Sequence, residues 1–169
     1  MTTRFPLPDP PQRISAIRHV VYEYGNLISA AHWSMHGQAP WRTHADDAFI
    51  LGYRKLDDFL MADKRTVSGG RELDDILALD YLPPHASRSW DLPIWKAEWK
   101  RPMNKQLAHI TYDRDKEWVH WKWVPQLENE LRTAWSKFLG AIVDASFRQE
   151  FDAQLMECQS KPGFKSLPL

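Results

Sequence analysis

Residues 14–35 read ISAIRHVVYEYGNLISAAHWSM, and their apolar side chains recur at alternating steps of three and four residues. This period is typical of an α-helix with one apolar face, because each residue advances the helix by about 100°. Asp9 precedes two prolines, as a capping carboxylate does at a helix start, and Gly37 and Pro40 are helix-ending residues. The stretch therefore predicts one long helix. Its stripe consists of Ile14, Ile17, Val21, Tyr24, Ile28, Ala31 and Met35.

The rest of the chain repeats the same period. A second helix is expected after Thr43, which can cap it; its stripe is Phe49, Tyr53, Leu56 and Leu60, widened by Leu51 and Phe59. Residues 73–82 predict a short helix that two prolines stop, and residues 85–100 predict a loop followed by a short helical piece. A last long helix is expected to open at Pro125. Its stripe is Leu127, Leu131, Trp135, Phe138, Ile142 and Val143, continuing through Phe147, Phe151 and Leu155.

These patterns predict an all-α protein, a bundle of four to six helices. We expect one domain over residues 12–160, an extended segment over residues 1–11 and a tail over residues 161–169. The formal net charge is zero, which excludes an overall field that attracts nucleic acid. The only cysteine is Cys158, so no intrachain disulfide can form. No apolar run approaches the ~20 residues of a membrane span, and a cytoplasmic location without membrane contact is expected.

The stretch RPMNKQLAHITY, residues 101–112, is the most site-like in the chain. Its proline suits a first helical turn. On a helical wheel, the apolar side chains Met103, Leu107 and Ile110 fall on one side. The opposite side carries Arg101, Lys105, His109 and Tyr112. The segment thus predicts a helix with a core face and a polar face that presents two cations, an imidazole and a phenol.

His109 has the chemistry for cleaving RNA. An imidazole can take a proton from a ribose 2′-hydroxyl near neutral pH, and a cation must stabilise the phosphorane. Lys105 lies one helical turn before His109, and Arg101 lies about 12 Å away along the axis at 1.5 Å per residue. Lys105 is the closer partner, whereas Arg101 can pair two oxygens. The alternative is structural, in which His109 bonds a neighbouring helix or a loop carbonyl.

The surrounding segment, residues 96–122, carries three more basic than acidic side chains, with tryptophans between them. Cations for phosphates and rings for bases are the components of a single-strand-binding surface, to which Tyr112 and Arg114 would also belong. The alternative is that the tryptophans fill the core. The core is favoured for Trp99 and Trp118, and both readings stay open for Trp121 and Trp123.

Two further groups are candidates. Arg54 lies off its helix's stripe, where it is expected to pair with Asp57 or Asp58 on the surface or to supply a second cation for the His109 site. His32 and His36 are four residues apart, a spacing that can place two imidazoles on one metal. A third ligand would be needed, and candidates near in sequence are His44, Asp46 and Asp47. Packing of the two histidines at a helix end is the alternative, and no cofactor is assigned.

Three segments together resemble a group of small bacterial proteins that is similar to the HEPN superfamily of helical bundles. They are AFILGYRKLDDFL at residues 48–60, NKQLAHITY at residues 104–112, and the last helix with Trp135, Phe138 and Leu139. The resemblance covers roughly residues 12–145. It implies a HEPN-like bundle that forms a homodimer.

The resemblance also implies a site. Active members carry an arginine, a polar residue and, four to six residues later, a histidine, and they cleave RNA without metal across a dimer interface. His109 matches the histidine and Asn104 the polar residue, but Met103 occupies the arginine position. Arg101 is the nearest arginine, with seven residues between it and His109. We therefore expect a catalytically silent dimer that binds RNA or a protein partner. A metal-independent ribonuclease is the alternative, and a His-ligated metal bundle is a further one.

Overall fold

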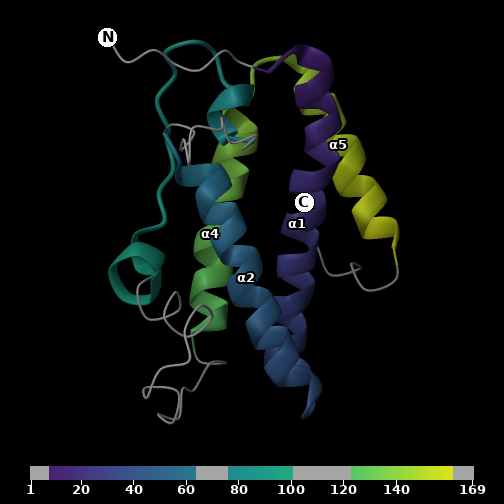
Figure 1. Ribbon diagram of the computed structural model, residues 1–169, viewed down its shortest axis with the longest axis vertical. Helices are drawn as coiled ribbons and strands as arrows, with labels where there is room; N and C mark the ends of the chain where they lie inside the picture. The colour runs from purple at the N-terminus through teal and green to yellow at the C-terminus, as the bar shows by residue number, and fades with distance from the viewer. Residues whose placement is uncertain (1–7, 64–75, 101–122, 162–169) are drawn as a thin grey trace, which may run out of the picture.

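The computed structural model describes residues 8–63, 76–100 and 123–161. These residues form four α-helices, a 3-10 helix and a π-helical turn, with no strand in the described ranges, which confirms the all-α prediction (Figure 1). The elements in chain order are α1 (Pro10–His36), α2 (Trp41–Met61), η1 (Ala78–Tyr81), η2 (Trp95–Trp99), α4 (Val124–Ala141) and α5 (Ala145–Ser160). None of the described helices is both long enough and apolar enough to span a membrane.

The first helix begins where its sequence predicts. Asp9 accepts a hydrogen bond from the backbone N–H of Gln12 at 2.8 Å, and the Gln12 side chain accepts one from the backbone N–H of Asp9 at 3.2 Å. This reciprocal pair satisfies two N–H groups that a helix start leaves without partners. Because the helix starts at Pro10, the boundary expected at residue 11 falls inside α1. Ile14, expected in the stripe, is 37% exposed.

The second helix keeps its predicted stripe but not its predicted start. Helix α2 begins at Trp41 with no side-chain cap, so the assignment of Thr43 as its capping residue was wrong. Leu51 was expected to widen the stripe, yet its side chain is 48% exposed. Leu51 stands two residues from Tyr53, and two residues turn a helix by about 200°, so the two side chains point to opposite sides.

The last predicted helix is two helices. Helix α4 ends at Ala141 and α5 begins at Ala145, and Val143 between them is 75% exposed rather than part of a stripe. Asp144 causes the break because its Oδ1 accepts hydrogen bonds from the backbone N–H groups of Ser146 and Phe147, which starts a new helix. A hydrogen bond from the Ser146 hydroxyl, together with these backbone bonds, holds the pKa of the Asp144 carboxyl below its ordinary value.

The helices pack around one aromatic core. α1 and α2 run antiparallel and make the most extensive helix–helix contact of the described chain, and α5 lies along α1 (Figure 1). Gly52 of α2 allows a close approach, since a Cβ there would lie 3.2 Å from the Cβ of Leu27. The expected short helix between residues 73 and 82 is the 3-10 helix η1, which places Tyr81 in the core. The rings that meet there are Phe59, Tyr81, Trp135, Phe138 and Phe151.

Candidate functional site

Most predicted site residues lie between η2 and α4. Residues 101–122 are outside the described part of the chain, so the shared helix face proposed for them stays a prediction. The site residues concerned are Arg101, Asn104, Lys105, His109, Tyr112 and Arg114. The structure does describe the two positions at which the chain leaves for this segment and returns from it, together with Arg54, His32 and His36.

Lys100, the last described residue before this segment, lies beside a buried carboxylate of α2. The Nζ of Lys100 lies 2.6 Å from Oδ2 of Asp57, whose side chain is only 3% exposed. The expectation that Asp57 is a surface partner of Arg54 was therefore wrong. Asp57 follows Tyr53 by four residues and so shares its buried face, whereas Arg54 is partly exposed beside it. Arg54, the predicted second cation of a His109 site, therefore lies on α2 close to the buried Asp57.

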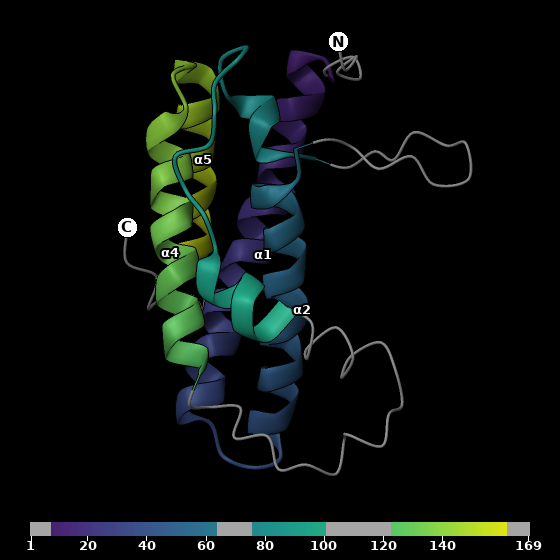
Figure 2. The same ribbon diagram turned by 90° about the vertical axis from the view of Figure 1, so that its left-hand side faces the viewer.

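A buried glutamate of α4 fixes the start of η2. The carboxylate of Glu130 accepts three hydrogen bonds, from the Tyr53 hydroxyl at 2.8 Å and from the backbone N–H groups of Ile94 at 2.6 Å and Trp95 at 3.1 Å. Glu130 is 9% exposed, so these bonds replace the water it has lost. Burial, and then the negative charge of Glu130, raise the pKa of Tyr53 far above its ordinary value. In Figure 2 the ribbon of η2 lies across α2 and α4, the helices that carry Tyr53 and Glu130.

Tryptophans join the two ends of the segment. The rings of Trp99 and Trp123 lie with their centroids 5.3 Å apart, and Trp123 also lies 6.1 Å from Phe49 of α2. Trp123 is 4% exposed, which places it in the core rather than on a base-stacking surface. Trp99 is partly buried against the same core, as predicted. Trp118 and Trp121 fall outside the described residues.

We call this group of residues the platform: Tyr53, Asp57, Trp95, Trp99, Lys100, Trp123 and Glu130. Neither of its two acidic members was predicted from the sequence to be buried: Asp57 was expected on the surface, and Glu130 was not a candidate. Glu130 directly precedes Leu131 and follows Leu127 by three residues, so it stands on the apolar stripe of its helix, where a charged side chain must find a partner. That position was the available signal. Both carboxylates of the platform contact groups of the same chain, so we interpret their role as structural.

The opposite arrangement occurs where α1 turns into α2. His32 and His36 are exposed, and their ring centroids are 4.8 Å apart. Asp46, a candidate third metal ligand, is buried instead and accepts a hydrogen bond from the Ser34 hydroxyl. Among the described residues, no three His, Cys, Asp or Glu side chains lie close enough together to hold a metal ion. The turn therefore offers two imidazoles without a described third ligand.

Large rings are exposed at this same end. Trp33 is 54% exposed and Trp41 is 69% exposed. The neighbouring cation, Arg42, donates hydrogen bonds to the carbonyl oxygens of Ser34 at 2.9 Å and Met35 at 3.2 Å, so it fastens the turn. We call the exposed group the turn surface: His32, Trp33, His36, Trp41 and His44.

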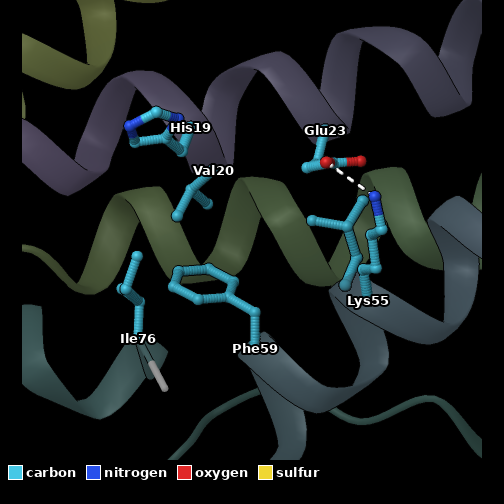
Figure 3. Close-up of a pocket in the computed structure, with 7 residues that line it drawn as sticks. His19, Val20, Glu23, Lys55, Phe59 and Ile76 are labelled. Atoms are coloured by element: carbon cyan, nitrogen blue, oxygen red, sulfur yellow. Dashed lines mark hydrogen bonds and ion pairs between the residues drawn. The ribbon is translucent and has the colours of Figure 1, made fainter. Parts of the chain in front are cut away.

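A groove between α1 and α2 is the remaining candidate (Figure 3). Phe59 and Val20 form its apolar floor, and the ion pair between Glu23 and Lys55, 2.7 Å long, closes one end. Its volume of about 190 Å³ is below the ~300–1,000 Å³ of ordinary ligand pockets. His19, a titratable residue in its lining, accepts a hydrogen bond from Arg18 at 3.3 Å. The groove fits one small apolar group and lacks a set of catalytic side chains.

Comparison with known proteins adds no relative to these observations. No protein-family model matches the chain, and neither the curated proteins nor the solved structures show a significant match to it. The functional argument therefore rests on the platform, the turn surface and the predicted site in residues 101–122.

Proposed function

We propose that this protein is a catalytically silent, HEPN-like binding module that forms a homodimer and takes a protein partner on its turn surface. The supporting observation is the exposure of Trp33 and Trp41, at 54% and 69%. The other tryptophans of the described core show that this chain can bury such rings. They are at most 5% exposed: Trp90, Trp95, Trp123 and Trp135. Two large rings left in water at one end favour a partner that covers them.

The chemistry of the turn favours protein over RNA. Single-stranded RNA is held by cations on its phosphates as well as by rings on its bases. At the turn, Arg42 is bonded to two carbonyl oxygens of α1, and Asp47 adds an exposed negative charge. Tryptophan is among the residues most enriched at the energetic centres of protein–protein interfaces.

The test compares capture by matched variants. The full chain, Trp33→Ala and Trp41→Ala would be immobilised, captured proteins identified by mass spectrometry, and each one purified and titrated against the same variants. Tyr22→Ala is the control, because Tyr22 is an equally exposed ring of α1, at 52%, well before the turn. We expect at least one purified protein whose affinity falls more than tenfold in both tryptophan variants and stays unchanged in the control. If the tryptophan variants instead lose affinity for single-stranded RNA alone, the protein partner is the wrong choice.

The second candidate is a metal-independent ribonuclease. It rests on the sequence observation that His109, Lys105 and Arg101 share one face of a predicted helix. Mixed RNA incubated with the full chain in EDTA, beside His109→Ala, separates the two. A silent module leaves the RNA intact in both samples. Cleavage that His109→Ala abolishes would replace the proposal with the enzyme.

A further inference from the structure

Helix α2 carries a stripe of side chains that the described part of the chain leaves exposed. His44, Ala48 and Leu51 are exposed, and they follow one another at steps of four and three residues, so they lie along one side of the helix. We call these three residues the α2 stripe. This is the spacing with which two helices interlock, and the alanine at its centre permits a close approach of their axes. Leu51, 48% exposed, is its largest apolar member.

Opposite charges flank the stripe along one side. Asp47 is exposed and Arg54 is partly exposed. They are seven residues apart, which is close to two full turns, so both lie on the same edge of the helix. If two copies of α2 packed in parallel around a twofold axis, this edge of one helix would face the opposite edge of the other, and Asp47 and Arg54 would not meet. In an antiparallel pair centred between Ala48 and Leu51, Asp47 of each copy faces Arg54 of the other, and both contacts become attractive.

We infer that the homodimer forms through the α2 stripe, with the two α2 helices antiparallel and each Asp47 paired with Arg54 of the second copy. The inference rests on the proposed homodimer and names its surface. Ala48 of one copy then faces Leu51 of the other, and His44 faces Lys55. The contact spans about 16 Å of helix at 1.5 Å per residue. A seam of this length belongs among the smaller interfaces, so the dimer is reversible and depends on concentration.

The antiparallel arrangement also places the two turn surfaces. Each α2 begins at Trp41, beside the turn, so antiparallel pairing directs the two turns to opposite ends of the dimer. The second copy therefore covers His44, which belongs to both surfaces, but not Trp33, which lies on α1. One dimer can hold two partner molecules.

Charge reversal tests the surface and its register together. Sedimentation equilibrium of the full chain would measure the dimer dissociation constant for wild type, Asp47→Arg, Arg54→Asp and the double variant. Each single reversal turns two symmetric attractions into two repulsions, so we expect roughly ten- to a hundredfold weaker dimerisation. The double variant restores opposite charges across the interface and returns the constant to within about threefold of wild type.

A second pair of variants tests the apolar contact. Leu51→Glu places a charge in the centre of the seam, and we expect it to abolish the dimer at every accessible concentration. Met156→Glu is the matched control, since Met156 is a helical side chain 60% exposed on α5, and it should leave the dimer unchanged. A monomeric wild type would overturn the inference. So would Leu51→Glu lowering thermal stability without changing mass, because another part of the same chain would then cover the stripe.

The inference and the proposed function fail separately. Asp47→Arg and Arg54→Asp should weaken the dimer and keep Trp33-dependent partner capture by each monomer. Trp33→Ala should lose capture and keep the wild-type dimer constant. Reversal variants that dimerise normally overturn the α2 contact and leave the turn surface in place.

Discussion

The platform and the turn surface reverse the usual distribution of side chains in opposite ways. At the platform, the carboxylates of Glu130 and Asp57 are buried, and each contacts η2 or a residue that directly flanks it. At the turn, Trp33 and Trp41 are exposed. The first reversal is accompanied by internal hydrogen bonds to Glu130 and an ion pair to Asp57. The two rings of the turn are left largely uncovered by the described residues, and the proposed partner rests on this difference.

The sharpest way to break this contrast is to remove the platform's central acceptor. Glu130→Ala leaves the Tyr53 hydroxyl and the N–H groups of Ile94 and Trp95 buried without their partner. We expect a loss of about 4 kcal/mol of unfolding free energy, since each orphaned donor costs about 1–3 kcal/mol and part of this is recovered by relaxation. Urea denaturation measures it.

A matched control separates burial from charge. Glu150→Ala removes a glutamate of α5 whose carboxylate accepts a hydrogen bond from its helical neighbour Gln154, and it should cost less than about 0.5 kcal/mol. Equal losses in the two variants would mean that the Glu130 bonds add nothing specific.

Alkali extends the contrast to two tyrosines of α1. Burial raises the pKa of Tyr24, stacked 4.3 Å from Trp135, to about 12, whereas Tyr22 is 52% exposed. The fold favours the neutral phenol of Tyr24, so its stabilisation is complete below the unfolded pKa near 10 and is lost as the pH rises through about 12. The size is about 2–3 kcal/mol for a shift of roughly two units.

Denaturation curves at a series of alkaline pH values measure this loss. Tyr24→Phe should flatten the decline above pH ~10, and Tyr22→Phe should leave it unchanged. Burial also raises the pKa values of Tyr53 and Tyr81, so some decline remains in either variant. An unaltered curve for Tyr24→Phe would contradict the assignment.

A smaller effect is expected from the platform's cation. Lys100→Met leaves the buried Asp57 carboxylate without its ion pair, and we expect a loss of about 1–2 kcal/mol, because the ammonium is itself 45% exposed and partly screened. Lys96→Met is the control four residues earlier, since Asp91, the partner of Lys96, is 59% exposed. The control should change the unfolding free energy by less than about 0.5 kcal/mol. The two losses, compared by denaturation, test whether burial of the carboxylate makes the difference.

The smallest change in stability is expected at the turn. Trp33→Ala and Trp41→Ala remove rings that are mostly in water, so each should shift the unfolding free energy by less than about 0.5 kcal/mol. Thermal melts of both variants measure this. A loss above about 2 kcal/mol would show that the rings support the fold, and the contrast with the platform would disappear.

The local sequence pattern predicted which side chains of the helices face the core, but not the break between α4 and α5. The stripe of Phe49, Tyr53, Leu56 and Leu60 faces the core as predicted, because helical period is a local property of the sequence. The break before α5 was missed since Ile142 and Val143 continue the apolar period, and the capping bonds of Asp144 decide the outcome.

The same limit explains the candidate sites. The bond from Tyr53 to Glu130 joins residues 77 positions apart, and no local period encodes such a pair. The exposure of Trp33 depends on which helices cover α1, which is again a property of the tertiary structure. The site predicted on residues 101–112 used local period alone, and it stays a prediction together with its ribonuclease chemistry.

The contact between Trp99 and Trp123 has a consequence for how this protein can change in evolution. Because these two rings meet, positions 99 and 123 lie side by side in the structure although they are well separated along the chain. The entropy of closing a chain interval grows only with the logarithm of its length, about 0.6 kcal/mol for each doubling. A change in the number of residues between the two tryptophans therefore costs little closure entropy. The ring contact can persist while the length of this one interval varies.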